Sequence, residues 1–109
     1  MPTDVRAVLV TAPDHEAAEE LARALVEEGL IACASLVPGV VSIYRWKGEL
    51  KREDEVLLIM KTTATRIPEL RERTAELHPY EVPEVLVLPV DDGLGPYLDW
   101  VRTEVGGRS

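Results

Sequence analysis

Apolar positions along the chain recur with two periods, which predict an alternation of strands and helices. The run 6–12 ("RAVLVTA") is short, mostly apolar and followed by Pro13, a pattern typical of a strand. Apolar residues then recur every three or four positions over residues 14–28. Asp14 is a suitable N-cap for this segment, and Gly29 supplies a stop, so the pattern predicts a helix.

The middle of the chain predicts a long hairpin. Residues 31–46 ("IACASLVPGVVSIYRW") are typical of a strand with an interruption at Pro38-Gly39. Because a proline cannot donate to a strand ladder, we expect a bulge or bend there. The charged segment 47–54 ("KGELKRED") is typical of a hairpin tip, and 55–62 ("EVLLIMKT") predicts the returning strand.

The last third of the chain predicts a helix, a strand and a terminal helix. The earlier of these two helices begins near Thr65, a candidate N-cap. It ends at His78, because a residue before proline avoids the helical region. Residues 84–90 ("EVLVLPV") are typical of a strand and 96–105 ("PYLDWVRTEV") of a short helix. The order β-α-β-β-α-β plus a C-terminal helix predicts an α+β, ferredoxin-like sandwich, with two helices on one face of four antiparallel strands.

Two of the predicted strands have no polar face. The segments 56–60 ("VLLIM") and 85–90 ("VLVLPV") are apolar at successive positions, which is typical of strands buried on both faces. Two helices cover only one face of a sheet, and the terminal helix is too short to cover the other. A second copy of the chain is the simplest cover, so the pattern predicts a homo-oligomer.

Length and composition bound the class of protein. The chain has 109 residues, 46% of them hydrophobic, which fits one packed domain over residues 1–109. Residues 1–6 lack the pattern of a signal peptide, and no apolar run is long enough to span a membrane. We therefore expect a cytoplasmic protein with no membrane partner. The absence of Asn and Gln fits a thermophilic source and a high-GC genome equally.

Charge and cysteine content exclude some partners and some kinds of site. Twenty acidic residues against 12 basic ones give a net charge of −8, so nucleic acid is not an expected partner, while cations are favoured. Cys33 is the single cysteine, which excludes an internal disulfide and a CxxC metal site. No set of nucleophile, base and orienting residue is visible, so we expect no catalytic activity and no organic cofactor.

Four blocks of the sequence together resemble the CutA family of divalent-cation tolerance proteins. The blocks are 32–49 ("ACASLVPGVVSIYRWKGE"), 58–63 ("LIMKTT"), 78–84 ("HPYEVPE") and 97–100 ("YLDW"). The pairing of PG-x-x-S-x-Y-x-W-x-G with HPY-x-x-PE is specific. The resemblance implies a homotrimer similar in plan to the PII signalling proteins, with the sheets facing the three-fold axis and the hairpin paired with a neighbour. It also implies a role in tolerance of copper and other divalent metals, by binding or signalling.

Three residues are candidate metal ligands. The resemblance makes His78 the family's recurring histidine, and imidazole binds copper well. Glu84 is a candidate partner ligand, and Cys33 is either a thiolate ligand for copper(I) or a buried, inert thiol. Alternatively, His78 only closes a helix, where its ring bonds the last carbonyls or favours the helix dipole. Some family members have further soft ligands where this chain has Val10 and Leu77, so we expect weak metal binding.

Two functions remain open at this stage. The first is a divalent-cation tolerance protein that binds copper(II) or a similar ion as a homotrimer. The second is a PII-like signalling or interaction module that binds a small ligand in a cleft between subunits, with Lys61 and Glu84 nearby. The aromatic residues are Tyr44, Trp46, Tyr80, Tyr97 and Trp100. They either line this cleft or pack in the core or between subunits.

Overall fold

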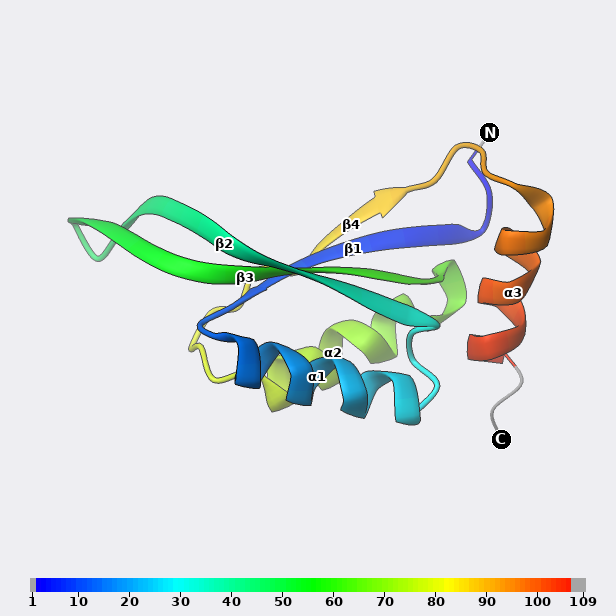
Figure 1. Cartoon of the computed structure of the whole chain (residues 1–109), viewed down its shortest axis with the longest axis horizontal. Coiled ribbons are helices and arrows are strands. Elements are labelled where there is room, and N and C mark those ends of the chain that lie inside the picture. Colours follow the sequence, from blue (N-terminus) through cyan, green and yellow to red (C-terminus); the bar gives the residue numbers. More distant parts are fainter. Residues whose placement is uncertain (1, 107–109) are drawn as a thin grey trace.

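A four-stranded sheet and three α-helices form the part of the chain that the computed structural model describes, residues 2–106. All strand pairs are antiparallel, in the order β2-β3-β1-β4. The elements are β1 (Val5–Ala12), α1 (His15–Glu27), β2 (Cys33–Trp46), β3 (Glu49–Thr63), a 3-10 helix (Ala64–Arg66), α2 (Ile67–Leu77), β4 (Leu86–Pro89) and α3 (Gly95–Gly106). The predicted α+β class and the predicted order of elements are confirmed (Figure 1).

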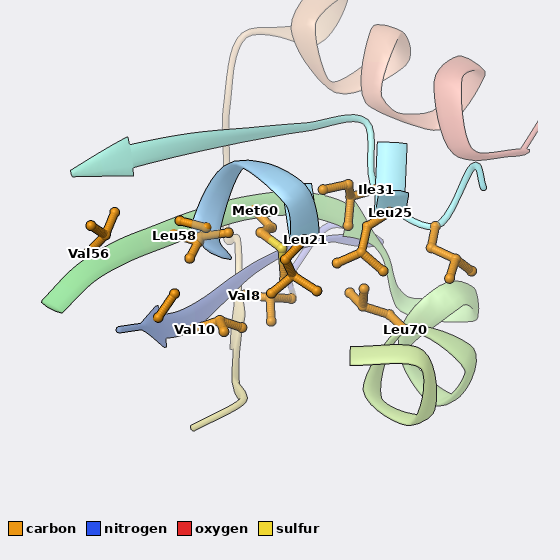
Figure 2. Packing of buried hydrophobic residues seen from close by; sticks show 12 residues of the cluster. Val8, Val10, Leu21, Leu25, Ile31, Val56, Leu58, Met60 and Leu70 are labelled. Carbon is orange, nitrogen blue, oxygen red and sulfur yellow. The ribbon is translucent and has the colours of Figure 1, made fainter. Parts of the chain in front are cut away.

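Helices α1 and α2 cover one face of the sheet and form the main core with it (Figure 1). Successive residues of a strand face opposite sides, so alternate side chains of β1 and β3 point toward these helices. Figure 2 shows the resulting cluster, whose labelled members are Val8, Val10, Leu21, Leu25, Ile31, Val56, Leu58, Met60 and Leu70. Burial of one such side chain contributes about 1.5–3 kcal/mol, so this layer holds the sheet in place beneath the site.

Local chemistry sets the ends of the two covering helices, with one correction to the prediction. Asp14 caps α1 as predicted, because its side chain accepts a backbone N–H bond at 2.8 Å. Helix α2 begins at Ile67, after a 3-10 turn, and not near Thr65. The Thr65 hydroxyl lies 3.2 Å from that of Thr63 and does not cap the helix. Pro68, which lacks an N–H, fits the first turn of a helix that begins there.

Helix α3 packs over the end of the sheet that is remote from the hairpin tip (Figure 1). Its side chains Leu98, Val101 and Val105 form a second, smaller core. Val5 of β1 and Ala32, just before β2, complete this cluster. The predicted terminal helix therefore exists, and it covers only part of the second face.

The hairpin of β2 and β3 projects beyond both covering helices and is more regular than predicted (Figure 1). The segment 47–54 was expected to form its tip, but β3 already begins at Glu49. Lys47 and Gly48 alone make the turn, with φ of 48° and 83°. Positive φ at both positions is the geometry of a two-residue turn that matches the twist of a hairpin. The charged residues that follow stay in a strand because both faces of this arm meet solvent.

The predicted bulge at Pro38-Gly39 is confirmed. The pairing register between β2 and β3 shifts there by one residue, and Gly39 has φ of 77°. Such a shift exchanges the two faces of the strand beyond it. It places Tyr44 and Trp46 on the same face of the arm as Glu55 of β3. The bulge thus gathers the side chains of the site described below.

The sheet face opposite α1 and α2 is apolar and largely open. Leu86 of β4 pairs with Leu9 of β1. The neighbours of Leu9 along the strand point into the main core, so Leu9 and Leu86 point to the opposite face. Leu86, Leu88 and Val37 remain 54%, 42% and 40% exposed. Large apolar side chains rarely gather in the open on a protein that acts as a monomer.

Candidate functional site

A cavity of ≈ 650 Å³ lies where the end of β1, the hairpin arm and the loop after α2 meet. Its lining residues are Thr11, Ser42, Ile43, Tyr44, Trp46, Glu55, Pro79, Tyr80, Glu81, Val82 and Glu84. Small ligands occupy cavities of this size. Most of the "HPYEVPE" motif therefore forms one wall, and three of the chain's aromatic residues contribute to the others.

His78 closes α2, as predicted. Its backbone N–H donates to the carbonyl of Thr74 at 2.9 Å, and its own backbone is extended, with ψ of 139°. Pro79 follows and disfavours the helical region at the residue before it. The chain therefore leaves the helix at His78 and turns across the end of the sheet.

The ring of His78 is buried and bonded at both nitrogens, to partners that the sequence did not predict. Nε2 lies 2.7 Å from the carbonyl oxygen of Thr11, and Nδ1 lies 3.1 Å from the amide nitrogen of Tyr80. A carbonyl only accepts and an amide N–H only donates. The geometry therefore assigns the proton to Nε2 and the lone pair to Nδ1. A metal bound at either nitrogen would replace one of these hydrogen bonds.

Tyr80 links the loop to a buried carboxylate. Its hydroxyl donates to Glu55 Oε2 at 2.7 Å, and Glu55 is only 7% exposed. Burial first, then the hydrogen bond to Glu55 and the charge of that carboxylate, raise the pKa of Tyr80 well above its ordinary value. Tyr80 therefore stays protonated at neutral pH and remains a hydrogen-bond donor to Glu55.

The cavity is acidic. Glu81 and Glu84 line it beside Glu55, and both are exposed. No lysine or arginine is among the lining residues. Within residues 2–106, none of these three carboxylates takes part in an ion pair. Their combined negative potential favours a cation.

Cys33 lies away from the cavity. It begins β2 and, through β3, belongs to the same cross-strand row as Ala7 of β1. His78 contacts Thr11, four residues further along β1, and four residues of a strand span about 13 Å. One chain thus brings His78 and Glu84 to the same region but does not bring Cys33 to them. The prediction of Cys33 as a ligand would need another copy of the chain.

The thiol of Cys33 has a local partner. Its Sγ lies 3.6 Å from the hydroxyl of Tyr97 on α3. This hydrogen bond first, and burial second, raise the pKa of Tyr97 to about 12. The ring of Tyr97 also lies 5.7 Å from that of Trp100. The contact between Cys33 and Tyr97 ties α3 to the start of β2.

The described part of the chain contains no group of three or more His, Cys, Asp or Glu side chains placed to hold one metal ion. Lys61, expected near a ligand cleft, lies outside the cavity, with its ammonium 3.4 Å from Ser35 Oγ and from the carbonyl of Ile59. The sequence analysis placed Glu55 at the start of the returning strand without predicting its burial, and it assigned Glu81 no role. Because side chains alternate along β3, Glu55 lies on the same face of the sheet as Leu57. This alternation can be read from the sequence and could have indicated the position of Glu55.

Proteins with this fold and related sequences are known. The family model of the CutA1 divalent ion tolerance protein matches residues 6–104. The divalent-cation tolerance protein CutA of Thermus thermophilus is 52% identical over 99 residues, which cover 91% of this chain and 96% of that one. The crystal structure of CutA from Xylella fastidiosa has a TM-score of 0.92 at 41% identity, covering 94% of this chain and 99% of that one. A structure from Archaeoglobus fulgidus, described as the periplasmic divalent cation tolerance protein CutA, has a TM-score of 0.90 at 32% identity, covering 93% and 98%.

The fold and the matched sequence define the class as a small α+β protein of divalent-cation tolerance. The chain belongs to the CutA1 family of divalent ion tolerance proteins. The resemblance inferred from the sequence motifs is therefore confirmed. None of the helices in residues 2–106 has the length and apolar character that crossing a bilayer requires.

Proposed function

We propose that this chain acts in divalent-cation tolerance as a cytoplasmic homotrimer that binds the ion, copper(II) first among the candidates, and catalyses no reaction. The proposal includes the PII-like trimeric plan of ferredoxin-like subunits. It includes no nucleic-acid or membrane partner, because the net charge of −8 repels phosphate and anionic lipid alike.

The open apolar face of the sheet is the observation that carries this proposal. Leu86 and Leu88 belong to an edge strand, and their side chains are 54% and 42% exposed. Within residues 2–106, one backbone edge of β4 has no strand beside it. Another copy would cover the leucines and shield the edge. A closed ring of copies with cyclic symmetry achieves this for every subunit at once.

The negative potential of the cavity supports binding of a cation. The small number of ligands within one chain supports a site that two copies share. Glu84 faces an acidic cavity, and His78 lies on the same loop, but two donors do not make a tight site. A further donor from a neighbouring copy would complete the coordination. Coordination through His78 would also require one of its hydrogen bonds to open, which fits weak binding.

Calorimetric titration of the metal-free protein with copper(II) tests the metal proposal. The series consists of the unaltered chain, His78→Ala, Glu84→Gln and Cys33→Ser. We expect saturable binding near one ion per chain, weakened at least about tenfold by loss of a true ligand. Glu20→Gln serves as the control, because Glu20 is exposed on α1 and its replacement removes the same charge as Glu84→Gln. This variant should leave binding unchanged.

Binding that persists unaltered in all three variants would contradict the proposed ligands. Each variant is first compared with the unaltered chain by circular dichroism, so that a loss of fold is not counted as a loss of a ligand.

A second candidate function is favoured by the cavity itself. Its volume of ≈ 650 Å³ exceeds what a single ion needs and matches a small organic ligand. This supports a PII-like interaction module that responds to such a ligand. Thermal unfolding in the presence of metals and of small metabolites separates the two, because a ligand that binds only the folded state raises Tm by an amount that grows with the logarithm of its concentration relative to Kd.

A further inference from the structure

Glu55 is a buried carboxylate without a cation. It is 7% exposed, and its Oε2 accepts the Tyr80 hydroxyl. Among residues 2–106, no hydrogen-bond donor contacts Oε1, which is not one of the fully buried side-chain atoms and therefore opens toward the cavity. A charge on a largely buried side chain is stabilised by a cation, because burial removes much of its hydration. The cavity therefore presents an acceptor that lacks its positive partner.

Three aromatic residues line the same cavity as this acceptor. Tyr44 and Trp46 line the cavity from the hairpin arm, and Tyr80 lines it from the loop. Organic cations bind to the faces of such rings, with tryptophan the most favourable. The ring of Trp46 already attracts an ammonium, since Lys47 Nζ lies 5.6 Å from its centroid. Rings and carboxylates together are typical of sites for amines.

The spacing of the carboxylates argues against a hard divalent cation held by these carboxylates of one chain alone. A hard divalent cation collects six or more oxygens at short range. Glu55, Glu81 and Glu84 all line the cavity, yet they do not form a group placed to hold one ion. Separated carboxylates suit a ligand whose positive charges are themselves separated. Ile43 and Val82, also in the lining, provide apolar contact for the chain between those charges.

We propose that the cavity binds a linear aliphatic polyamine, with one ammonium on Glu55, a second on Glu84 or Glu81, and the methylene chain against Trp46 and Val82. This inference rests on the second candidate function, a small-ligand module, and shares only Glu84 with the proposed copper ligands. It names the chemical class of the ligand and the residues that would select it.

Calorimetric titration of the full chain with spermidine at fixed ionic strength tests the proposal. We expect saturable binding that an equal charge concentration of magnesium does not displace. Glu55→Gln keeps an acceptor for Tyr80 but removes the charge, and should weaken spermidine binding at least about tenfold. Trp46→Leu should weaken it roughly threefold by removing the ring. Glu20→Gln, on the exposed side of α1, should have no effect.

Several results would overturn the polyamine site. Spermidine binding that magnesium displaces fully, or that survives in Glu55→Gln, would show only diffuse attraction to an acidic protein. If Glu55→Gln fails to fold, the double variant Glu81→Gln/Glu84→Gln, at two exposed positions, provides the test, and unaltered spermidine binding in it would contradict the site. A Trp46→Leu variant with altered molar mass but unaltered spermidine binding would assign the ring to subunit packing. Copper binding, measured separately with Trp46→Leu, should not change, so the two proposals fail independently.

Discussion

His78 joins three parts of the chain through one side chain and one backbone amide. Its backbone ends α2, its Nε2–H reaches β1 at Thr11, and its Nδ1 receives the amide of Tyr80. Tyr80 in turn fixes Glu55. The residue therefore positions the loop that walls the cavity, whether or not it also meets a metal.

Replacement of His78 should destabilise the fold. His78→Ala removes two buried hydrogen bonds and leaves the carbonyl of Thr11 without its donor, so we expect unfolding to become easier by about 3 kcal/mol. His15→Ala, on the exposed start of α1, is the matched control. Urea unfolding measures both, and equal effects of the two variants would contradict the assigned role.

Tyr80 and Tyr97 should make the protein sensitive to alkali. Folding raises the pKa of both above the ordinary value of 10.0, that of Tyr97 to about 12. Their contribution to stability is therefore complete below about pH 10 and is lost as the pH rises through the folded-state pKa values. Stability measured by urea unfolding should decline above about pH 10, and should decline less in Tyr80→Phe. A tyrosinate absorbance titration compares the unaltered chain with Tyr80→Phe. If the tyrosine lost in the variant ionises with the ordinary pKa of about 10, the result would contradict this assignment.

The sequence predicted the position of His78 but not its bonds. Pro79 is adjacent and acts locally, so the end of α2 could be predicted. The ring's partner Thr11 lies 67 residues away, and only the folded sheet brings it near. The burial of Glu55 was not predicted for a related reason, because a charged residue in a charged segment is expected to be solvated.

The hairpin of β2 and β3 is the element that departs most from the average strand. Its arm extends past the covering helices, so strand pairing and side-chain contacts within the hairpin, such as Arg45 with the carbonyl of Gly48, hold its outer part (Figure 1). Lys47 adopts φ of 48°, which is unfavourable for a residue with a long side chain, whereas Gly48 at 83° is well suited. The turn therefore contains one favourable and one unfavourable residue.

Two substitutions in the turn should change stability in opposite directions. Asparagine tolerates positive φ, so Lys47→Asn should stabilise the protein by about 0.5–1 kcal/mol. Gly48→Ala should destabilise it by about 1 kcal/mol. Nothing lies within 4 Å of a Cβ added at Gly48, so this effect comes from backbone conformation alone. Thermal unfolding measures both, and a shift of the same sign in each would contradict the turn geometry.

Charge misled the prediction of the hairpin, while glycine and proline did not. The run 47–54 is mostly charged and was assigned to a tip. Polar residues form strands where both faces meet solvent, a condition that depends on how far the arm projects from the core. The interruption at Pro38-Gly39 was predicted because it follows from backbone chemistry alone.

At the scale of the whole molecule, helices α1 and α2 cover one sheet face, and α3 covers only part of the other. The sequence already indicated this, because β3 and β4 have apolar residues on both faces and two helices can cover only one face. The folded chain leaves Leu86 and Leu88 exposed on the uncovered face. The number of copies that cover it depends on the angle between interfaces, which the periodicity of a single sequence does not contain.

A charge on the open face should break the assembly. Leu88→Glu places a carboxylate where another copy is proposed to pack, and we expect monomers in sedimentation velocity. Leu77→Glu, a similarly exposed leucine at the end of α2, should leave the assembly intact. Intact assembly in Leu88→Glu, or dissociation in both variants, would place the interface elsewhere.

The molar mass of the unaltered protein in solution tests the central claim most directly. The proposed function, with its shared metal ligands and covered sheet face, requires a homotrimer. Sedimentation equilibrium at micromolar concentration should give three times the chain mass of 12.1 kDa, with no smaller species present. A mass equal to that of one chain would leave the leucines of β4 uncovered in solution and would contradict the account.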